Sequence, residues 1–142
     1  IKYFVDPELN KSNGSAIGLE FQVLDDRKHP DAKQGKNGNR TVGSLYDLIR
    51  AENNDTGGRG KSFKGINQWN NARIVVRNGH VEHWLNHVKV VSFDRFSQTF
   101  KALVEKSKYE KWEDFGRLPE GNILLQDHGN KVSFKNIKVR EF

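Results

Sequence analysis

The sequence predicts an all-β sandwich with one short helix. Seven short segments are rich in β-branched and aromatic residues and are bounded by Gly, Asn or Asp, whereas a single stretch has helical spacing. The pair Asn78-Gly79 joins two of these segments directly, as in a type I′ hairpin turn. Many short strands with one helix are typical of a sandwich rather than of alternating βαβ units.

The expected strands are, in chain order, Ile1–Val5, Ile17–Leu24, Asn71–Arg77, His80–Asn86, Val88–Phe93, Asn122–Asp127 and Lys131–Arg140. The helix is expected over Phe96–Tyr109, because Phe96, Phe100, Leu103 and Val104 share one face and Ser97 can cap it. A second tight connection is expected at Gly129-Asn130. Two long segments, Asp25–Arg40 and Glu52–Gln68, lack a regular pattern, and loops of this length are usually functional or disordered.

Composition limits the kinds of protein this chain can be. With 142 residues and no internal repeat, it is expected to form one domain. The net charge is +6, but the basic residues are scattered and interleaved with acids, which favours a solvated basic surface over a nucleic-acid interface. No apolar run approaches the roughly 20 residues of a membrane span, no signal peptide is visible, and no phosphate-binding glycine motif indicates a cofactor.

The expected strand Ile17–Leu24 separates polar from apolar side chains. Because side chains alternate across a strand, Glu20 and Gln22 share the face opposite Leu19, Phe21 and Val23. A carboxylate in the middle of a strand is either exposed to solvent or buried with a partner. The residues alone leave both interpretations of Glu20 open.

The strand His80–Asn86 has the same alternation. Val81, His83 and Leu85 lie on one face, and Glu82 and Trp84 lie on the other. An apolar setting favours a core histidine with a hydrogen-bond partner over a catalytic one. Trp84 is either a core residue or a platform on which a sugar ring stacks.

Possible metal ligands do not form a recognisable motif. The acidic run with Asp25, Asp26, His29 and Asp31 does not match the spacing of a calcium loop. The histidines His80, His83 and His87 are too loosely arranged to indicate zinc. We therefore expect no metal site.

Several motifs carry a resemblance that covers nearly all of Gly18–Glu141. They are "GLEFQVLDDRKHPDAKQGKNGNRTVGSLYDLI", "NQWNNARIVVRNGHVEHWLNHVKV", "LVEKSKY" and "EGNILLQDHGNKVSFKNIKVRE", in this order. Together they resemble the 3-keto-disaccharide hydrolases. The resemblance implies a concanavalin A-like antiparallel sandwich, or jelly roll, that binds sugar on its concave face.

The resemblance also implies that residues 1–142 are the C-terminal part of a larger sandwich whose N-terminal strands are missing from this chain. One departure from the family is His87, which stands where relatives more often have Gly. We expect the hairpin to be less tight at that position. By resemblance, the protein is expected in the periplasm, in the cell envelope or outside the cell.

The chemistry implied by the resemblance begins with a glycoside oxidised to a ketone at carbon 3. The ketone acidifies the hydrogen on carbon 2, so that a base can remove it and the aglycone can leave from carbon 1. The expected catalytic residues are Glu20, as base or acid, and His83, as its partner. The expected substrate-binding residues are Gln22, Asp26, Tyr46, Trp69, Arg73, Trp84, Gln126 and His128.

Two other functions remain possible on the same scaffold. A carbohydrate-binding module would bind sugar without turnover, since a fold does not determine a function. An ordinary glycoside hydrolase would need two carboxylates that face each other about 5–9 Å apart, for which Glu20 and Glu82 are the candidates. All three hypotheses have a carbohydrate as the partner and require no cofactor.

Overall fold

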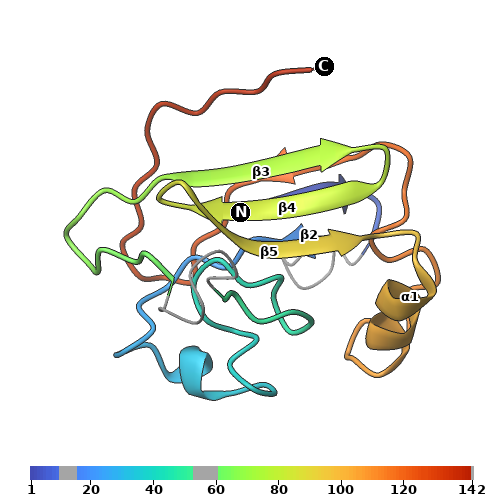
Figure 1. The fold of residues 1–142 in the computed structure, drawn as a ribbon, viewed down its shortest axis with the longest axis horizontal. Helices are drawn as coiled ribbons and strands as arrows, with labels where there is room; N and C mark the ends of the chain where they lie inside the picture. The colour runs from blue at the N-terminus through green and yellow to red at the C-terminus, as the bar shows by residue number, and fades with distance from the viewer. Residues whose placement is uncertain (10–15, 53–60, 142) are drawn as a thin grey trace.

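The structure is a computed structural model, and it describes residues 1–9, 16–52 and 61–141. Two antiparallel sheets of three strands each form a β-sandwich (Figure 1). In the first sheet the order is β2 (Ile17–Glu20), β1 (Lys2–Asp6), β6 (Asn122–Leu124). In the second it is β3 (Ala72–Arg77), β4 (His80–Leu85), β5 (Val88–Asp94), and α1 (Gln98–Glu105) follows. The predicted sandwich with one helix is confirmed.

The two turns of the second sheet are both tight. Asn78 and Gly79 have φ angles of 49° and 84°, and Arg77 pairs with His80, which confirms the predicted type of connection. Asn86 and His87 have φ angles of 49° and 70°, and Leu85 pairs with Val88. The expectation of a looser hairpin at His87 is therefore wrong, because this histidine adopts the left-handed conformation that a tight turn requires.

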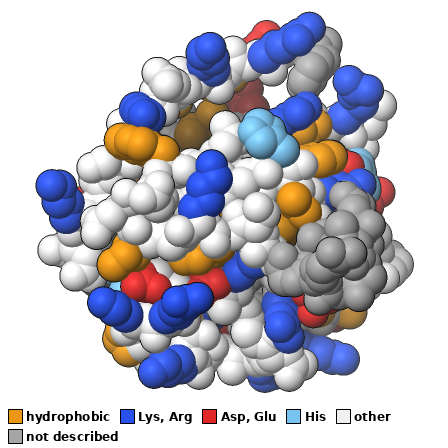
Figure 2. Space-filling view, turned by 60° about the vertical axis from the view of Figure 1, so that its left-hand side comes forward, with side chains coloured by type: hydrophobic (Ala, Val, Ile, Leu, Met, Phe, Trp, Pro, Cys, Tyr) orange, Lys and Arg blue, Asp and Glu red, His pale blue; other side chains and the backbone are white. Residues whose placement is uncertain are grey.

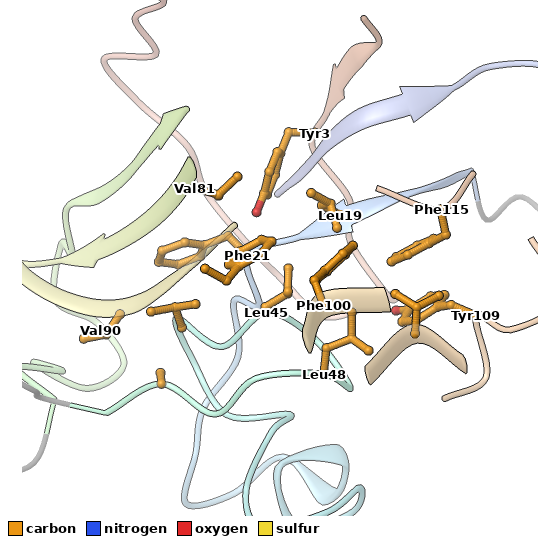
Figure 3. Close-up of a cluster of buried hydrophobic side chains, with 14 of the residues drawn as sticks. Tyr3, Leu19, Phe21, Leu45, Leu48, Val81, Val90, Phe100, Tyr109 and Phe115 are labelled. Atoms are coloured by element: carbon orange, nitrogen blue, oxygen red, sulfur yellow. The ribbon is translucent and has the colours of Figure 1, made fainter. Parts of the chain in front are cut away.

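The core lies between the two sheets. Tyr3 from β1, Leu19 from β2 and Val81 from β4 point toward one another in Figure 3. Phe100 from α1 joins them and closes one end of the core, where its ring stacks on Phe93 with 5.2 Å between centroids. The faces turned away from this core are therefore the outer faces of the two sheets.

The helix is shorter than predicted at both ends, although its N-cap is the expected residue. Ser97 is the N-cap, and its hydroxyl accepts a hydrogen bond from the backbone N–H of Phe100 at 3.1 Å. Phe100 and Val104 are its buried residues. The helix ends at Glu105 because Ser107 turns back, with its N–H and its hydroxyl both donating to the carbonyl of Val104 at 3.0 Å and 2.8 Å.

Three expected strands are shortened or absent. β2 ends at Glu20 and β6 ends at Leu124, so each is shorter than the sequence pattern predicts. The expected strand Lys131–Arg140 does not form, and Ile137 and Val139 are 63% and 72% exposed. A strand needs a hydrogen-bonding neighbour, and this segment leaves the body of the sandwich toward the C-terminus (Figure 1).

The surface agrees with the scattered charge pattern of the sequence. Figure 2 shows Lys and Arg side chains spread over the visible face, with uncharged surface between them. Among the described residues, none of the helices has the length and apolar character that a membrane crossing requires.

Candidate functional site

Glu20 lies on the outer face of the first sheet, and loops cover most of it. It pairs across the sheet with Lys2, whose Nζ is 3.9 Å from Oε2 of Glu20. Only 13% of the Glu20 side chain is exposed. Burial raises the pKa of Glu20 above its ordinary value of 4.5, although the positive charge of Lys2 opposes the shift. A raised pKa moves a carboxyl group toward the range in which it can take up and release a proton, as general acid–base catalysis requires.

The segment Gly43–Tyr46 runs beside the end of β2, to which its backbone is hydrogen-bonded. The N–H of Gly43 donates to the carbonyl of Gln22 at 2.9 Å, and the N–H of Gln22 donates to Ser44 at 3.1 Å. The N–H of Tyr46 donates to the carbonyl of Glu20 at 3.0 Å. Tyr46, which the sequence predicts to bind substrate, therefore lies beside Glu20.

A second group of charges is centred on Arg40. Its Nε donates to Asp47 at 2.7 Å, and its Nη1 donates to Asp31 at 2.8 Å. These bonds raise the pKa of Arg40, which stays charged. Asp31 also accepts a weak hydrogen bond of 3.4 Å from Nε2 of Gln22, which joins this group to the face that carries Glu20.

Lys108 reaches the same group from the loop that follows α1. Its Nζ lies 4.1 Å from the ring centroid of Tyr46 and 5.1 Å from that of Tyr109. It is also 3.9 Å from Oδ2 of Asp47. The positive charge of Lys108 acts on the pKa of Glu20, so the two groups are close enough to interact electrostatically. We refer below to Lys2, Glu20, Gln22, Asp31, Arg40, Tyr46, Asp47 and Lys108 as the polar cluster.

Gln126 and His128 follow β6 along the edge of the same sheet. Leu124 pairs with Lys2, which in turn pairs with Glu20, and β6 ends at Leu124, so Gln126 and His128 lie just beyond the strand. Gln126 is half-buried and His128 is exposed. The charge of His128 lowers the pKa of Glu20, which indicates that His128 is near the carboxylate.

His83 lies in the core and not in the polar cluster. Its Nδ1 bonds to the carbonyl of Gly43 at 2.9 Å, and its Nε2 bonds to the hydroxyl of Tyr3 at 2.7 Å. Because a carbonyl can only accept, Nδ1 carries the proton and Nε2 accepts from Tyr3. The face pattern of the strand, which favoured a core histidine, is thus confirmed. The expected partnership of His83 with Glu20 has to be corrected, because Glu20 points to the opposite side of its sheet.

Arg73 and Trp84 lie on the outer face of the second sheet. They pair across β3 and β4, and the guanidinium carbon of Arg73 is 5.7 Å from the Trp84 ring centroid. Nε1 of Trp84 donates to Oε2 of Glu82 at 2.8 Å. The core therefore separates these residues from Glu20. Glu82 and Glu20 point away from each other, so they do not form the facing pair that ordinary glycoside hydrolysis needs.

Asp26 and Trp69 also have other partners. Asp26 accepts a 2.7 Å hydrogen bond from the N–H of Val42 and forms a 2.6 Å ion pair with Lys61, which connects the two long segments. Trp69 is 52% exposed, and Nζ of Lys135 lies 4.0 Å from its ring centroid. Asp26 therefore holds the loops together in this structure rather than presenting a free carboxylate.

The acidic and histidine groups considered as metal ligands are dispersed. Asp26 and Asp31 are engaged by Lys61 and Arg40, respectively. His80 is exposed on one face of β4, whereas His83 is buried on the other. Within residues 1–9, 16–52 and 61–141, no three His, Asp or Glu side chains gather in a way that could hold a metal ion.

Sequence reasoning missed five members of the polar cluster. Three of them, Asp31, Arg40 and Asp47, come from segments in which spacing gives no periodic signal, and Asp31 lies in the short 3-10 helix Pro30–Lys33. Lys108 lies within the segment Phe96–Tyr109 that was predicted to be helical. Lys2 lies in a strand that the sequence predicts. Once that strand pairs with β2 in the observed register, Lys2 stands opposite Glu20.

The fold and the polar cluster define a β-sandwich protein with a buried carboxylate among cations on one sheet face. The chain belongs to the family of the 3-keto-alpha-glucoside-1,2-lyase-like domain, whose profile matches residues 1–140. It is 37% identical over 131 residues to a protein of Bacteroides thetaiotaomicron named 3-keto-disaccharide hydrolase. That alignment covers 85% of this chain and 43% of the relative, so the chain spans less than half the length of the curated relative it matches.

A solved structure from Parabacteroides distasonis, provisionally described as a glycosyl hydrolase, has a similar fold. The two superpose with a TM-score of 0.58 at 26% sequence identity. The match covers 74% of this chain and 47% of the other. It supports the same sandwich architecture that the strand order gives.

Proposed function

We propose that the polar cluster is part of the active site of a glycoside-processing enzyme that cleaves 3-keto-glycosides by elimination, with net hydrolysis after water adds. The observation that carries this proposal is the burial of Glu20 beside Lys2, which raises the pKa of the carboxyl group. The name of the Bacteroides relative supports the substrate class. By resemblance, the predicted location is the periplasm, the cell envelope or the exterior of the cell.

In this proposal Glu20 acts on the hydrogen at carbon 2. Its carboxylate takes the proton, and the electrons of the C–H bond form an enolate across carbons 2 and 3, with the negative charge on the ketone oxygen. Collapse of the enolate restores the ketone and forms a double bond between carbons 1 and 2. The bond from carbon 1 to the aglycone oxygen breaks with its electron pair, and that oxygen takes up a proton. Water then adds at carbon 1.

The other members of the site are proposed to bind the sugar. Gln22 lies on the same strand face as Glu20, and Tyr46 is hydrogen-bonded to the Glu20 backbone. Gln126 and His128 follow the strand that pairs with Lys2, and this supports a role for them as donors to substrate oxygens. His83, Arg73 and Trp84 are left out of this proposal because of their positions in the core and on the other sheet.

The proposal is tested with a 3-keto-glucoside that carries a 4-nitrophenyl aglycone. We expect the purified protein to release nitrophenol and Glu20→Gln to lose at least two orders of magnitude in kcat, because general-base catalysis contributes roughly 10²–10⁴-fold. The matched control is Glu105→Gln, an exposed glutamate on α1, which should keep the full rate. No release by the wild-type protein would overturn the proposal.

The two other functions give different results in the same series of variants. An ordinary two-carboxylate hydrolase would cleave the unoxidised 4-nitrophenyl glucoside and would lose that activity in Glu82→Gln. A binding module would bind sugar without releasing nitrophenol and would lose binding in Trp84→Ala but not in Glu20→Gln. The separation of Glu20 from Glu82 by the core already argues against the first of these.

A further inference from the structure

The polar cluster contains three cations, Lys2, Arg40 and Lys108. They differ in how many hydrogen bonds their charged groups donate within the protein. Arg40 donates to two carboxylates at 2.7 Å and 2.8 Å and to Oε1 of Gln34 at 3.3 Å. Lys2 donates to the carbonyl of Ala16 at 3.0 Å and also lies beside Glu20. Both are therefore engaged in holding the protein together.

Lys108 is held in a different way. Its ammonium lies over the rings of Tyr46 and Tyr109, which attract a cation but do not use its N–H groups as strong hydrogen bonds do. Its nearest carboxylate oxygen, in Asp47, is 3.9 Å away, beyond hydrogen-bond length. Within the part of the chain that the structure describes, no hydrogen bond uses the ammonium of Lys108. It can therefore donate to a ligand without first breaking a strong bond.

The position of Lys108 relative to Glu20 is set by Tyr46. The backbone of Tyr46 is bonded to the carbonyl of Glu20 at 3.0 Å, and the ring of Tyr46 lies 4.1 Å from the Lys108 ammonium. Tyr109 supports the other side, and its hydroxyl lies 3.5 Å from the Tyr46 carbonyl. The side chain of Lys108 is 46% exposed, so a ligand in solvent can reach it.

We propose that Lys108 binds the ketone oxygen at carbon 3 and stabilises the enolate that forms when Glu20 removes the proton from carbon 2. This inference rests on the proposed function. The negative charge grows on that oxygen only as the C–H bond breaks, so an ammonium aimed at it is more favourable in the transition state than in the bound substrate. Tyr109 is a positioning residue, because it holds the ammonium without contacting the sugar, whereas Tyr46 holds the ammonium and also lies where the sugar is proposed to bind.

A separate property of Lys108 fits this role. Burial lowers its pKa below the ordinary value of 10.5, although Asp47 opposes the shift. A lysine with a lowered pKa is a stronger hydrogen-bond donor to an enolate oxygen than a fully solvated one, because its acidity is closer to that of the enol.

The test compares Lys108→Met, Lys108→Arg and the exposed control Lys106→Met in two measurements. The first is release of nitrophenol from 4-nitrophenyl 3-keto-glucoside, and the second is exchange of the carbon 2 hydrogen in deuterated water. We expect Lys108→Met to lower kcat roughly 10²–10³-fold, as for removal of one oxyanion donor. The rate of exchange of the carbon 2 hydrogen should fall together with kcat, and KM should change little. Lys108→Arg should recover part of the rate, and Lys106→Met should keep all of it.

A second variant separates a chemical role from a structural one. The rate of Lys108→Ala should rise when methylammonium is added, whereas the rates of Glu20→Gln and the wild-type protein should not. Circular dichroism and thermal unfolding would show whether each variant is folded. If Lys108→Met is misfolded, the comparison rests on Lys108→Arg and on amine rescue of Lys108→Ala.

The outcomes distinguish this inference from the function on which it rests. Suppose that the wild-type protein is active and that the Lys108→Met variant is folded. If the variant then keeps its kcat, or differs only by a higher KM, the role of Lys108 is overturned and the proposed function stands. If methylammonium does not raise the rate of a folded Lys108→Ala variant, the role of Lys108 is likewise overturned. If the wild-type protein neither releases nitrophenol nor exchanges the carbon 2 hydrogen, both proposals fail together.

Discussion

The hydroxyl of Tyr3 donates a 2.7 Å hydrogen bond to Nε2 of His83 across the interface between the two sheets. Both side chains are buried, and the other ring nitrogen of His83 donates to the carbonyl of Gly43. The neutral imidazole is therefore fully satisfied in the core. A proton on Nε2 would remove the acceptor that Tyr3 uses and would place a charge in an apolar environment.

The first prediction concerns the dependence of stability on pH. Burial lowers the pKa of His83 from 6.5 to about 4, and the hydrogen bond to the Gly43 carbonyl opposes this shift. Between these values the unfolded chain binds the proton and the folded chain does not, so the free energy of unfolding falls as the pH is lowered from about 6.5 toward 4. The loss should be on the order of 2–3 kcal/mol. Urea unfolding at half-unit pH steps measures it.

The control for this pH dependence is His83→Gln, which cannot take up a proton. The variant is expected to be less stable than the wild-type protein at pH 7 but to show a flatter profile between pH 6.5 and 4. Equal slopes for the two proteins would show that His83 is not the group responsible.

The second prediction concerns Tyr3. Tyr3→Phe keeps the ring but leaves Nε2 of His83 without a donor in the core. An unsatisfied buried acceptor costs about 1–3 kcal/mol, and thermal or urea unfolding should show a loss of that size. Tyr109→Phe is the matched control, because the hydroxyl of Tyr109 makes only a 3.5 Å contact with the Tyr46 carbonyl. A larger loss in Tyr109→Phe than in Tyr3→Phe would contradict the assigned hydrogen bond.

The third prediction is that Glu20 reduces stability when it is ionised. The pKa of Glu20 is raised by burial, so the folded chain holds this proton at pH values where the unfolded chain has released it. The stability contributed by this group therefore decreases as the pH rises above 4.5. Glu20→Gln should have a higher melting temperature than the wild-type protein at pH 7, and the difference should vanish near pH 4. A lower melting temperature at pH 7 would indicate that the ion pair with Lys2 outweighs the burial.

The fourth prediction concerns the ion pair between Asp26 and Lys61. Asp26 bonds to Lys61 at 2.6 Å and to the Val42 N–H at 2.7 Å, and both side chains are largely covered. A double-mutant cycle with Asp26→Asn and Lys61→Met should give a coupling energy of about 1–2 kcal/mol. Arg50 and Glu52, which form an exposed pair at 3.6 Å, provide the comparison and should couple by less than about 1 kcal/mol.

The fifth prediction concerns the turn at Asn86-His87. His87 has a φ of 70°, which costs a non-glycine residue roughly 1 kcal/mol or more. His87→Gly should therefore raise the free energy of unfolding by about 0.5–1 kcal/mol, after allowing for the greater freedom of glycine in the unfolded chain. Asn86→Gly should do the opposite, because Asn86 accepts a 2.8 Å hydrogen bond from the Asn71 N–H. Equal effects of the two changes would contradict this account.

Local features of the fold could be predicted from the sequence because they depend on neighbouring residues. The Asn78-Gly79 turn, the Ser97 cap and the alternation of Val81, Glu82 and His83 all follow from short-range chemistry. The expected strand Lys131–Arg140 failed for the opposite reason. Its alternating pattern is suited to a sheet, but whether it pairs depends on a neighbouring strand that the described chain does not provide.

The candidate site was only partly predictable. Glu20, Gln22 and Tyr46 were identified because strand alternation or motif resemblance marked them. Arg40 and Lys108 are 68 residues apart in the sequence and meet only through the folded loops, as their shared contacts with Asp47 show. His83 shows the reverse error, in which a motif suggested catalysis although the apolar neighbours Val81 and Leu85 correctly indicated the core.

The bond from His83 to Gly43 links the centre of the molecule to the segment beside Glu20. Gly43 is followed by the three residues that run beside the end of β2, and the last of them, Tyr46, contacts Lys108. Sliding one sheet past the other by a single residue would break the bonds of His83 to both Tyr3 and Gly43. A histidine buried in the core thus fixes the position of the loop that runs beside Glu20.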